Sequence, residues 1–412
     1  MSGSILPETS AARAADRDPG WVTGRIARFF LSQIRIGRLT VVTPSGQRLT
    51  SPGERPGPEA VLVLHRWRLP WRLLLNGDID FGAAYIDGDW DSPDPGAVIE
   101  LATLNAPTLD GPAGGQLLPR LRNRLSHRMN ANSRRGSRRN IARHYDLGND
   151  FYAAWLDAGM SYSAALYQSA DQTLEDAQTA KQDRAIALLG LRGGERVLEI
   201  GCGWGGLAER LITTAGCHVT ALTLSRSQYN YTRARLAPHG ALADVRLQDY
   251  RDVQGTFDRI VSIEMVEAVG EAWWPAYFAT LRDRLAAGGT AVLQAITIAE
   301  DRFDLYRRRV DFVQRYIFPG GMLPTGAEIH RQALGAGLTS AGAETFGDGY
   351  ARTLTEWRRR FHAAWPAIEG LGFDTKFKRM WEYYLDYCAG GFRAGAVDVG
   401  FYALTKPKAG LR

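Results

Sequence analysis

The stretch RVLEIGCGWGGLAERL, residues 196–211, joins an apolar run, four glycines within six residues and the start of a helical pattern. The glycines are Gly201, Gly203, Gly205 and Gly206. Glycine lacks a Cβ atom, so a glycine-rich turn between a strand and a helix lets the backbone approach a ligand closely. Close packing of the helix on the strand does not require this many glycines. We therefore expect a ligand to bind at this turn.

Two kinds of ligand compete for the turn. Three of its glycines satisfy the Gly-x-Gly-x-x-Gly spacing of dinucleotide-binding folds, which also require an acid about 20 residues further on for the ribose. Thr223 and Ser225 stand there instead. The acid lies within the first strand, as Glu199, where it suits a ligand with an ammonium group, and Asp249 suits the exocyclic amine of an adenine. The pattern favours S-adenosylmethionine over NAD.

Short β-branched runs alternate with helical patterns from residue 196 onward. The runs are RVLEIG (196–201), HVTALTLS (218–225), VRLQDY (245–250), FDRIVSIE (257–264) and GTAVLQAITI (289–298). Such alternation predicts an α/β fold with a parallel, doubly wound, Rossmann-like sheet, whose ligands bind at the carboxyl ends of the strands. Helical segments over 302–318, 354–365 and 376–392 are predicted to form a lid over that edge.

The chain divides into four parts by composition and pattern. They are a disordered N-terminus (1–20), a small α+β domain (21–110), a linker rich in glycine and arginine (111–139) and the ligand-binding domain with its lid (140–412). Within the small domain we expect a hairpin around Pro44, Ser45 and Gly46. Residues 78–104 are expected to form turns that lead into a helix.

Positive charge is concentrated in one segment. The chain carries 50 Lys and Arg against 44 Asp and Glu, a net charge of +6. Nine arginines and no acid lie between Asp110 and Asp146, namely Arg120, Arg122, Arg124, Arg128, Arg134, Arg135, Arg138, Arg139 and Arg143. This arginine band is either a solvated linker or a surface for anionic phospholipid headgroups. Nucleic acid is disfavoured, because no aromatic residues for base stacking are interleaved with the arginines.

The sequence lacks the patterns of a metal site, of a disulfide framework and of a membrane-spanning helix. Cys202, Cys217 and Cys388 show neither a paired framework nor a metal-ligand spacing, so we expect no metal and a reducing compartment. No run of about 18 apolar residues could span a membrane. We expect a cytoplasmic protein that associates peripherally with the inner face of the membrane.

The segment RHYDLGNDFYAAWLDAGMSYSAALY, residues 143–167, is both aromatic and polar. It contains Tyr145, Tyr152, Trp155 and Tyr162. An amphipathic helix capping the core would explain the aromatic residues. Its glycines and polar turns are too frequent for a plain core helix, so we favour a cover over the cofactor.

From about residue 140 to residue 404 the chain resembles the cyclopropane-fatty-acid synthases and the related mycolic acid methyltransferases. The motifs that carry the resemblance are HYDLGNDFY, MSYS, VLEIGCGWGGLA, TLSRSQ, LQDYRD, FDRIVSIEMVEAVG, YIFPGGMLP and YYLDYCAGGFRAG. The resemblance implies transfer of a methyl group from S-adenosylmethionine to the double bond of an unsaturated acyl chain in a membrane phospholipid, giving a cyclopropane. It also suggests a homodimer.

By position, the resemblance implies a cofactor site with four parts. Tyr145, Tyr162 and Ser163 would cover the cofactor, and Gly201, Cys202 and Gly203 would approach its methionine part. Thr223, Ser225 and Gln228 would face the ribose, and Asp249 and Tyr250 would face the adenine. This agrees with the placement of Glu199 beside the ammonium group and with the polar, non-acidic end of the second strand.

In the family a bound bicarbonate is thought to accept the proton that leaves when the ring closes. Its shell is a cysteine, a glutamate, a histidine, a backbone group near an isoleucine and a tyrosine. This sequence keeps Glu267, Ile296 and Tyr350, and has Ala164 and Gln294 in place of the cysteine and the histidine. An alanine, residue 268, also replaces the histidine that often follows the glutamate. The catalytic candidates are therefore Glu267, Tyr350, Gln294 and Ile296.

These departures leave the product open. If the proton is lost after a hydride shift, the same cation gives a methyl- or methylene-branched chain instead of a ring. A lipid-binding protein without catalysis and a methyltransferase for small soluble molecules are further alternatives. The nearly complete cofactor loop argues against the first, and the arginine band with the aromatic lid segments argues against the second.

Overall fold

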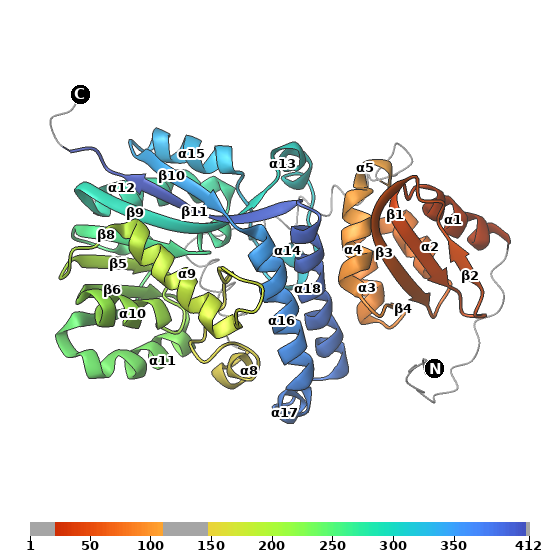
Figure 1. Ribbon diagram of the computed structural model, residues 1–412, viewed down its shortest axis with the longest axis horizontal. Helices are drawn as coiled ribbons and strands as arrows, with labels where there is room; N and C mark the ends of the chain where they lie inside the picture. Colours follow the sequence, from red (N-terminus) through yellow and green to blue (C-terminus); the bar gives the residue numbers. More distant parts are fainter. Residues whose placement is uncertain (1–20, 110–146, 409–412) are drawn as a thin grey trace. The chain divides into compact units, whose positions relative to one another are not determined.

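A computed structural model describes residues 21–109 and 147–408 and divides the chain into two compact units, residues 1–114 and 115–412 (Figure 1). The boundary between the units falls inside the expected linker. The expected disordered N-terminus and the whole arginine band lie outside the described residues.

The first unit contains a four-stranded sheet with the strand order β2-β1-β3-β4. Its elements are α1 (Trp21–Ser32), β1 (Ile36–Val42), β2 (Arg48–Thr50), β3 (Arg55–Leu64), α2 (Leu69–Asn76), α3 (Asp78–Ile86), β4 (Trp90–Asp91), α4 (Pro95–Leu104) and α5 (Ala106–Leu109). The expected hairpin joins β1 to β2, and its turn closes where Gly46 N donates to Thr43 O. β3 lies parallel to β1 on the other side.

One expectation for the first unit was wrong. Residues 78–86 were expected to form turns, yet they form the helix α3. The aspartates and glycine of this segment are poor helix formers. Ile79, Ala84 and Tyr85 nevertheless bury their side chains, from positions spread around the helix. Burial in the tertiary structure therefore outweighs the weak local propensity.

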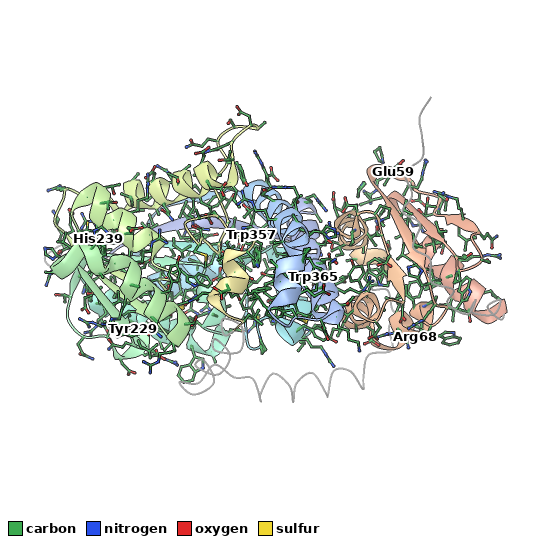
Figure 2. The ribbon with its side chains drawn as sticks, turned by 90° about the horizontal axis from the view of Figure 1, so that it is seen from below. Glu59, Arg68, Tyr229, His239, Trp357 and Trp365 are labelled. Atoms are coloured by element: carbon green, nitrogen blue, oxygen red, sulfur yellow. The ribbon has the colours of Figure 1, made fainter. Side chains whose placement is uncertain are left out.

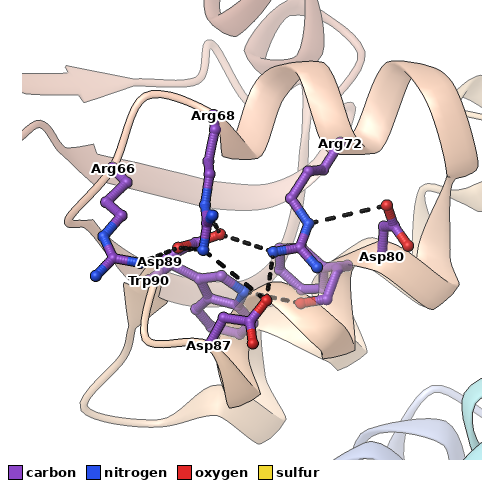
Figure 3. A network of polar contacts seen from close by, with 8 residues as sticks. Arg66, Arg68, Arg72, Asp80, Asp87, Asp89 and Trp90 are labelled. Carbon is purple, nitrogen blue, oxygen red and sulfur yellow. Dashed lines mark hydrogen bonds and ion pairs between the residues drawn. The ribbon is translucent and has the colours of Figure 1, made fainter.

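A polar network around Asp89 fastens β4 to the segment before α2 (Figure 3). The Asp89 carboxylate is fully buried and accepts hydrogen bonds from Arg68 at 2.7 Å, from Arg72 at 2.9 Å and from Arg66 at 3.2 Å. Burial alone would raise the pKa of Asp89, but the hydrogen bonds from Arg68 and Arg72 outweigh it and the pKa is lowered. Asp89 is therefore an ionised structural anchor of this unit.

The second unit contains a seven-stranded sheet with the strand order β10-β11-β9-β8-β5-β6-β7. The strands are β5 (Arg196–Ile200), β6 (His218–Thr223), β7 (Ala243–Leu247), β8 (Phe257–Ile263), β9 (Leu285–Ile298), β10 (Thr339–Thr345) and β11 (Val397–Thr405). β5 to β9 are the five predicted strands and pair in parallel. The Rossmann-like α/β fold is confirmed.

The sequence predicted a parallel sheet, but the sheet is mixed. β11 pairs antiparallel along its whole length with residues 290–298 of β9, and β10 pairs antiparallel with β11. β10 (TSAGAET) is almost entirely exposed, so its sequence lacks the apolar run by which the other strands were found. β11 was not predicted as a strand, because it follows a long helix closely in the chain.

Helices cover both faces of this sheet (Figure 1). They include α9 (Leu174–Leu189), α10 (Gly206–Ala215), α11 (Arg226–Leu236), α12 (Trp274–Arg284) and α15 (Gly326–Gly335). Successive strand residues point to opposite faces. On β5, Val197 enters the apolar cluster with α9 and α10, and Leu198 enters the cluster with α12 and α15. Two cores therefore hold the sheet rigid between them.

The remaining helices of the second unit gather at one end of the sheet (Figure 1). They are α8 (Asn149–Ala153), α13 (Glu300–Tyr306), α14 (Phe312–Tyr316), α16 (Gly347–Ala363), α17 (Trp365–Gly370) and α18 (Thr375–Arg393). α16 and α18 pack side by side. Figure 2 shows Trp357 of α16 among these helices. The predicted lid segments are therefore helical.

Candidate active site

The glycine turn after β5 has the backbone that the sequence predicted. Gly201, Gly203 and Gly205 all have positive φ, at 85°, 52° and 83°. Gly201 N and Cys202 N both donate to Leu222 O of β6, at 3.0 and 2.9 Å, so the turn is tied to the neighbouring strand.

The glycines of the turn have different roles. A Cβ atom on Gly205 would lie 2.7 Å from Thr232 Cγ2, so packing of the turn on α11 requires glycine there. A Cβ atom on Gly203 would meet nothing within 4 Å. The backbone at Gly203 therefore faces open space, which is where a ligand can approach.

Glu199 lies buried beside this turn at the end of β5. Its Oε2 atom has no hydrogen-bond partner among the described residues. Burial raises the pKa of Glu199 to about 7, opposed by the positive charges of Lys181 and Arg235. A buried carboxylate oxygen without a partner is unusual in a folded protein. It fits a ligand that brings its own donor, as the ammonium group of S-adenosylmethionine would.

The end of β6 is polar and internally bonded. Thr223 Oγ1 donates to Gln228 Oε1 at 2.9 Å, and Ser225 Oγ accepts from Gln228 N at 3.3 Å as the N-cap of α11. All three side chains are buried. The Ser225 hydroxyl thus already caps a helix, and its contact with the ribose, like those of Thr223 and Gln228, stays a prediction.

The end of β7 carries the acid expected at the adenine. The Asp249 carboxylate is buried and bonded to Arg251, with Arg251 NH2 donating to Oδ2 at 2.6 Å. The Tyr250 ring packs edge-on to Tyr277, and burial raises the pKa of Tyr250 to about 12. Asp249 is therefore an oriented anion. Its contact and that of Tyr250 with the adenine also remain predictions.

The aromatic segment before β5 packs on the glycine turn. Tyr145 lies outside the described residues. Tyr152 and Trp155 are fully buried, and the Tyr152 ring lies 4.9 Å from that of Trp204 in the turn. Tyr162 OH lies 2.9 Å from Tyr384 OH of α18. The segment therefore links the cofactor turn to the helical lid.

A buried lysine that the sequence reasoning missed holds this segment. Lys181 of α9 is buried and donates from Nζ to Ser163 Oγ at 2.7 Å. Gln178 Nε2 of the same helix donates to Ser163 O at 2.8 Å. Lys181 occupies the apolar stripe of α9, four residues from both Ala177 and Ala185. A lysine at a stripe position is a signal that could have identified it.

The hydrogen bonds of the four catalytic candidates fall into two sets. Tyr350 OH donates to Glu264 Oε2 at 2.7 Å, and Gln294 Nε2 donates to Glu264 Oε1, also at 2.7 Å. Glu267 instead accepts through Oε1 from the backbone N of Ile296. Glu264 was absent from the expected site, although it follows β8 as Asp249 follows β7. The structure therefore adds a second carboxylate to the candidates.

The two carboxylates differ in their surroundings. Burial raises the pKa of Glu267 to about 8, and the like charge of Glu264 adds to the effect. Glu267 Oε2 has no hydrogen-bond partner among the described residues. Burial also raises the pKa of Glu264, but its hydrogen bonds and Lys181 oppose that change. The hydrogen bonds to Glu264 and the positive charge of Lys181 therefore favour its ionised form, whereas Glu267 accepts fewer hydrogen bonds.

Solved structures with similar folds define the class of protein. The crystal structure of mycolic acid cyclopropane synthase CmaA1, complexed with SAH and CTAB, matches with a TM-score of 0.62 and 32% identity over 65% of this chain and 98% of that chain. A coclaurine N-methyltransferase structure matches with a TM-score of 0.61 at 19% identity, which supports the fold alone. The second unit is a methyltransferase fold of the class that uses S-adenosylmethionine.

The family follows from sequence comparison. The family model for mycolic acid cyclopropane synthetase matches residues 132–401. The tuberculostearic acid methyltransferase UfaA1 of Mycobacterium tuberculosis is 39% identical over 84% of this chain and 83% of its own length. The cyclopropane-fatty-acyl-phospholipid synthase of Escherichia coli is 37% identical over 80% and 83%.

The chain belongs to the mycolic acid cyclopropane synthetase family and is an S-adenosylmethionine-dependent methyltransferase. The predicted family, enzyme class and cofactor are confirmed. The open face of Gly203 and the unpartnered oxygen of Glu199 fit that cofactor.

Proposed function

We propose that the protein transfers a methyl group from S-adenosylmethionine to the double bond of an unsaturated acyl chain in a membrane phospholipid, and that the chain closes to a cyclopropane. The observation that carries the proposal is the pair of half-buried carboxylates with raised pKa values, Glu264 and Glu267, at the same sheet edge as the open glycine turn. The names of the E. coli relative and of the family model support this substrate and this product.

The residues around this edge suit a poorly nucleophilic, apolar substrate. An alkene reacts only if the methyl donor is held close and in line, and such orientation contributes several kcal/mol. Methyl transfer leaves a cation on the chain, which aromatic faces stabilise. The ring centroids of Tyr350 and Phe392 lie 4.6 Å apart, and those of Tyr162 and Trp357 lie 5.3 Å apart. These four rings would form the wall beside the reacting carbons.

A methyl- or methylene-branched product is the second candidate. The 39% identity to a methyltransferase named for tuberculostearic acid favours it. Ring closure and methylene formation both remove a proton from the transferred methyl group. They differ in whether a hydride first moves between the two former alkene carbons.

Peripheral membrane association completes the proposal. No helix in the described part of the chain is long and apolar enough to cross a membrane. Phe29, Trp71 and Leu74 on α1 and α2 are exposed apolar side chains that suit an acyl-chain interface. The arginine band would bind anionic headgroups on the cytoplasmic face, and the enzyme would act there as a homodimer.

The test uses the purified full chain with S-adenosylmethionine and vesicles of unsaturated phospholipid. Lipid mass spectrometry should show acyl chains that gain the mass of one CH₂ group. A ring and a methylene branch have equal mass, but mild catalytic hydrogenation adds hydrogen only to the methylene product. Resistance to hydrogenation supports the cyclopropane, reduction supports the branched alternative, and no change in lipid mass contradicts both.

A further inference from the structure

The five groups expected to hold bicarbonate all have hydrogen-bond partners within the protein. Three donors share the Glu264 carboxylate: Ala164 N at 2.8 Å, Gln294 Nε2 at 2.7 Å and Tyr350 OH at 2.7 Å. The remaining two, Glu267 and the backbone of Ile296, bond to each other. A bicarbonate ion here would have to displace a carboxylate from all three donors. The residues present therefore do not fit bicarbonate.

We propose that the Glu264 carboxylate takes the place of bicarbonate and itself accepts the proton lost from the transferred methyl group. This inference rests on the proposed function, since it assigns a residue to the deprotonation step of that reaction. It also gives a reason for the departures at Ala164 and Gln294. Ala164 contributes only its backbone N–H, and the Gln294 amide is a neutral donor to a carboxylate that is part of the chain.

The step balances without any further reagent. The methyl carbon bonds to one alkene carbon while its bond to sulfur breaks, and the sulfur keeps that electron pair. The other alkene carbon becomes the cation. The electron pair of one methyl C–H bond then forms the ring bond to that carbon. The proton passes to an oxygen of Glu264 and from there to solvent as the site reopens.

The surroundings of Glu264 suit a proton acceptor. A carboxylate with three donors still has lone pairs available for a proton. Burial raises its pKa, and a base is most effective when its pKa lies near the working pH. The charged and titratable groups coupled to it are Lys181, Tyr350, Glu267 and Cys388. Lys181 favours the ionised form and Glu267 opposes it.

The backbone gives independent support. Glu264 has a φ of 48°, and Met160 is the one other non-glycine residue with positive φ in the described part of the chain. A side chain in this left-handed region costs about 1–2 kcal/mol. Such strain concentrates at functional sites. Glycine would relieve this strain, which offsets part of the cost of leaving the three donors without the carboxylate in a Glu264→Gly variant.

Two variants separate a built-in base from an anchor that only holds α16 and β9 in place. Glu264→Gly empties the space between the three donors, and Glu264→Gln fills it with an amide that cannot accept the proton. Turnover is measured on unsaturated phospholipid vesicles in CO₂-free buffer, with and without added bicarbonate. Bicarbonate binding to each protein is measured separately by ¹³C NMR.

We expect the wild type to turn over equally in both buffers and to bind no bicarbonate. Both variants should lose about 10²–10⁴-fold in rate without it. Bicarbonate should bind to Glu264→Gly and restore its rate, but should do neither for Glu264→Gln. A Glu267→Gln variant should remain indifferent to bicarbonate.

Three results would overturn the inference. They are a wild type that binds or requires bicarbonate, a Glu264→Gly variant that keeps the wild-type rate without it, and a folded Glu264→Gly variant that neither binds bicarbonate nor recovers. If the wild type modifies no lipid, the proposed function fails instead. The NMR comparison of wild type and Glu264→Gly still tests the anion site in that case.

Discussion

At the scale of single residues, two backbone positions in the left-handed region lie at the carboxyl ends of neighbouring strands. Gly203 follows β5 and has a φ of 52°, and Glu264 follows β8 and has a φ of 48°. Glycine adopts this conformation without a steric penalty. Glutamate does not, so at position 264 the carboxylate must bring a benefit that exceeds the strain. We therefore propose that the missing side chain at position 203 admits the cofactor and that the carboxylate at position 264 takes part in the chemistry.

Gly203→Val should abolish binding of S-adenosylmethionine. The new side chain would occupy the open space into which the Gly203 backbone faces, and the left-handed backbone would add a stability cost of about 1–2 kcal/mol. Isothermal calorimetry of the folded variant measures the affinity.

Gly216→Val is the matched control. Gly216 caps the far end of α10 with a φ of 60°, and a Cβ atom there also meets open space. The control should lose similar stability and keep wild-type affinity. Cofactor affinity unchanged in Gly203→Val would place the ligand elsewhere.

The sequence predicts the residues of the glycine turn and fails on Glu264 and Lys181. The turn could be recognised because four neighbouring glycines have a local physical meaning. Glu264 accepts its hydrogen bonds from residues 30, 86 and 100 positions away in the chain. Lys181 reaches Ser163 across 18 residues. Contacts of this kind depend on tertiary packing, so a local pattern can single out such a residue but cannot give its partners.

At the scale of elements, the periodicity of the sequence predicts the strands and helices that are regular and buried. The five parallel strands were found because short runs with β-branched residues alternate with helical patterns along the chain. The exposed edge strand β10 and the Asp- and Gly-containing helix α3 were not, because neighbouring elements stabilise them. The Asp89 network illustrates this: one carboxylate joins β4 to arginines that lie 17 to 23 residues earlier.

Asp89→Asn should destabilise the first unit by about 1.5–3 kcal/mol, because three arginines lose a charged, buried partner. Urea unfolding followed by tryptophan fluorescence measures the change. The effect should also depend on pH. The folded pKa of Asp89 is lowered, so its contribution is complete above the unfolded-chain pKa of about 3.9 and is lost as the pH falls through the folded pKa.

Glu59→Gln is the control for the Asp89 variant. Glu59 pairs with Arg38 at 3.8 Å, and their side chains are 75% and 60% exposed. Exposed pairs contribute about 0–1 kcal/mol, so this variant should unfold close to the wild type. Equal, small shifts in both variants would show that the Asp89 network does not anchor the unit.

At the scale of the whole molecule, the chain combines a methyltransferase unit with a small α+β unit and a segment of nine arginines. Composition revealed the arginine band at once, since charge can be counted without knowing the fold. Composition does not identify the partner of the arginine band. A solvated linker and a headgroup surface have the same sequence, and only their response to salt and to charge removal differs.

The paired change Arg134→Ser with Arg135→Ser should weaken binding to anionic vesicles roughly 10- to 30-fold. Each arginine near such a surface contributes about 1 kcal/mol, and about 1.4 kcal/mol corresponds to a tenfold change in affinity. Co-sedimentation with phosphatidylglycerol vesicles measures it. Binding of the wild type should also fall steeply with added salt, because the Debye length shrinks from about 10 Å at 0.1 M to about 3 Å at 1 M.

The control for the arginine pair removes the same net charge from another part of the chain. Arg331 and Arg359 have side chains that are 70% and 68% exposed, and each pairs with a glutamate on its own helix. Because those glutamates already offset them, changing both to serine should alter vesicle binding far less. If the two paired variants weaken binding equally, the attraction follows net charge alone. If neither changes it and salt has no effect, the arginine band is a solvated linker, and the exposed apolar side chains of α1 and α2 must provide the membrane contact.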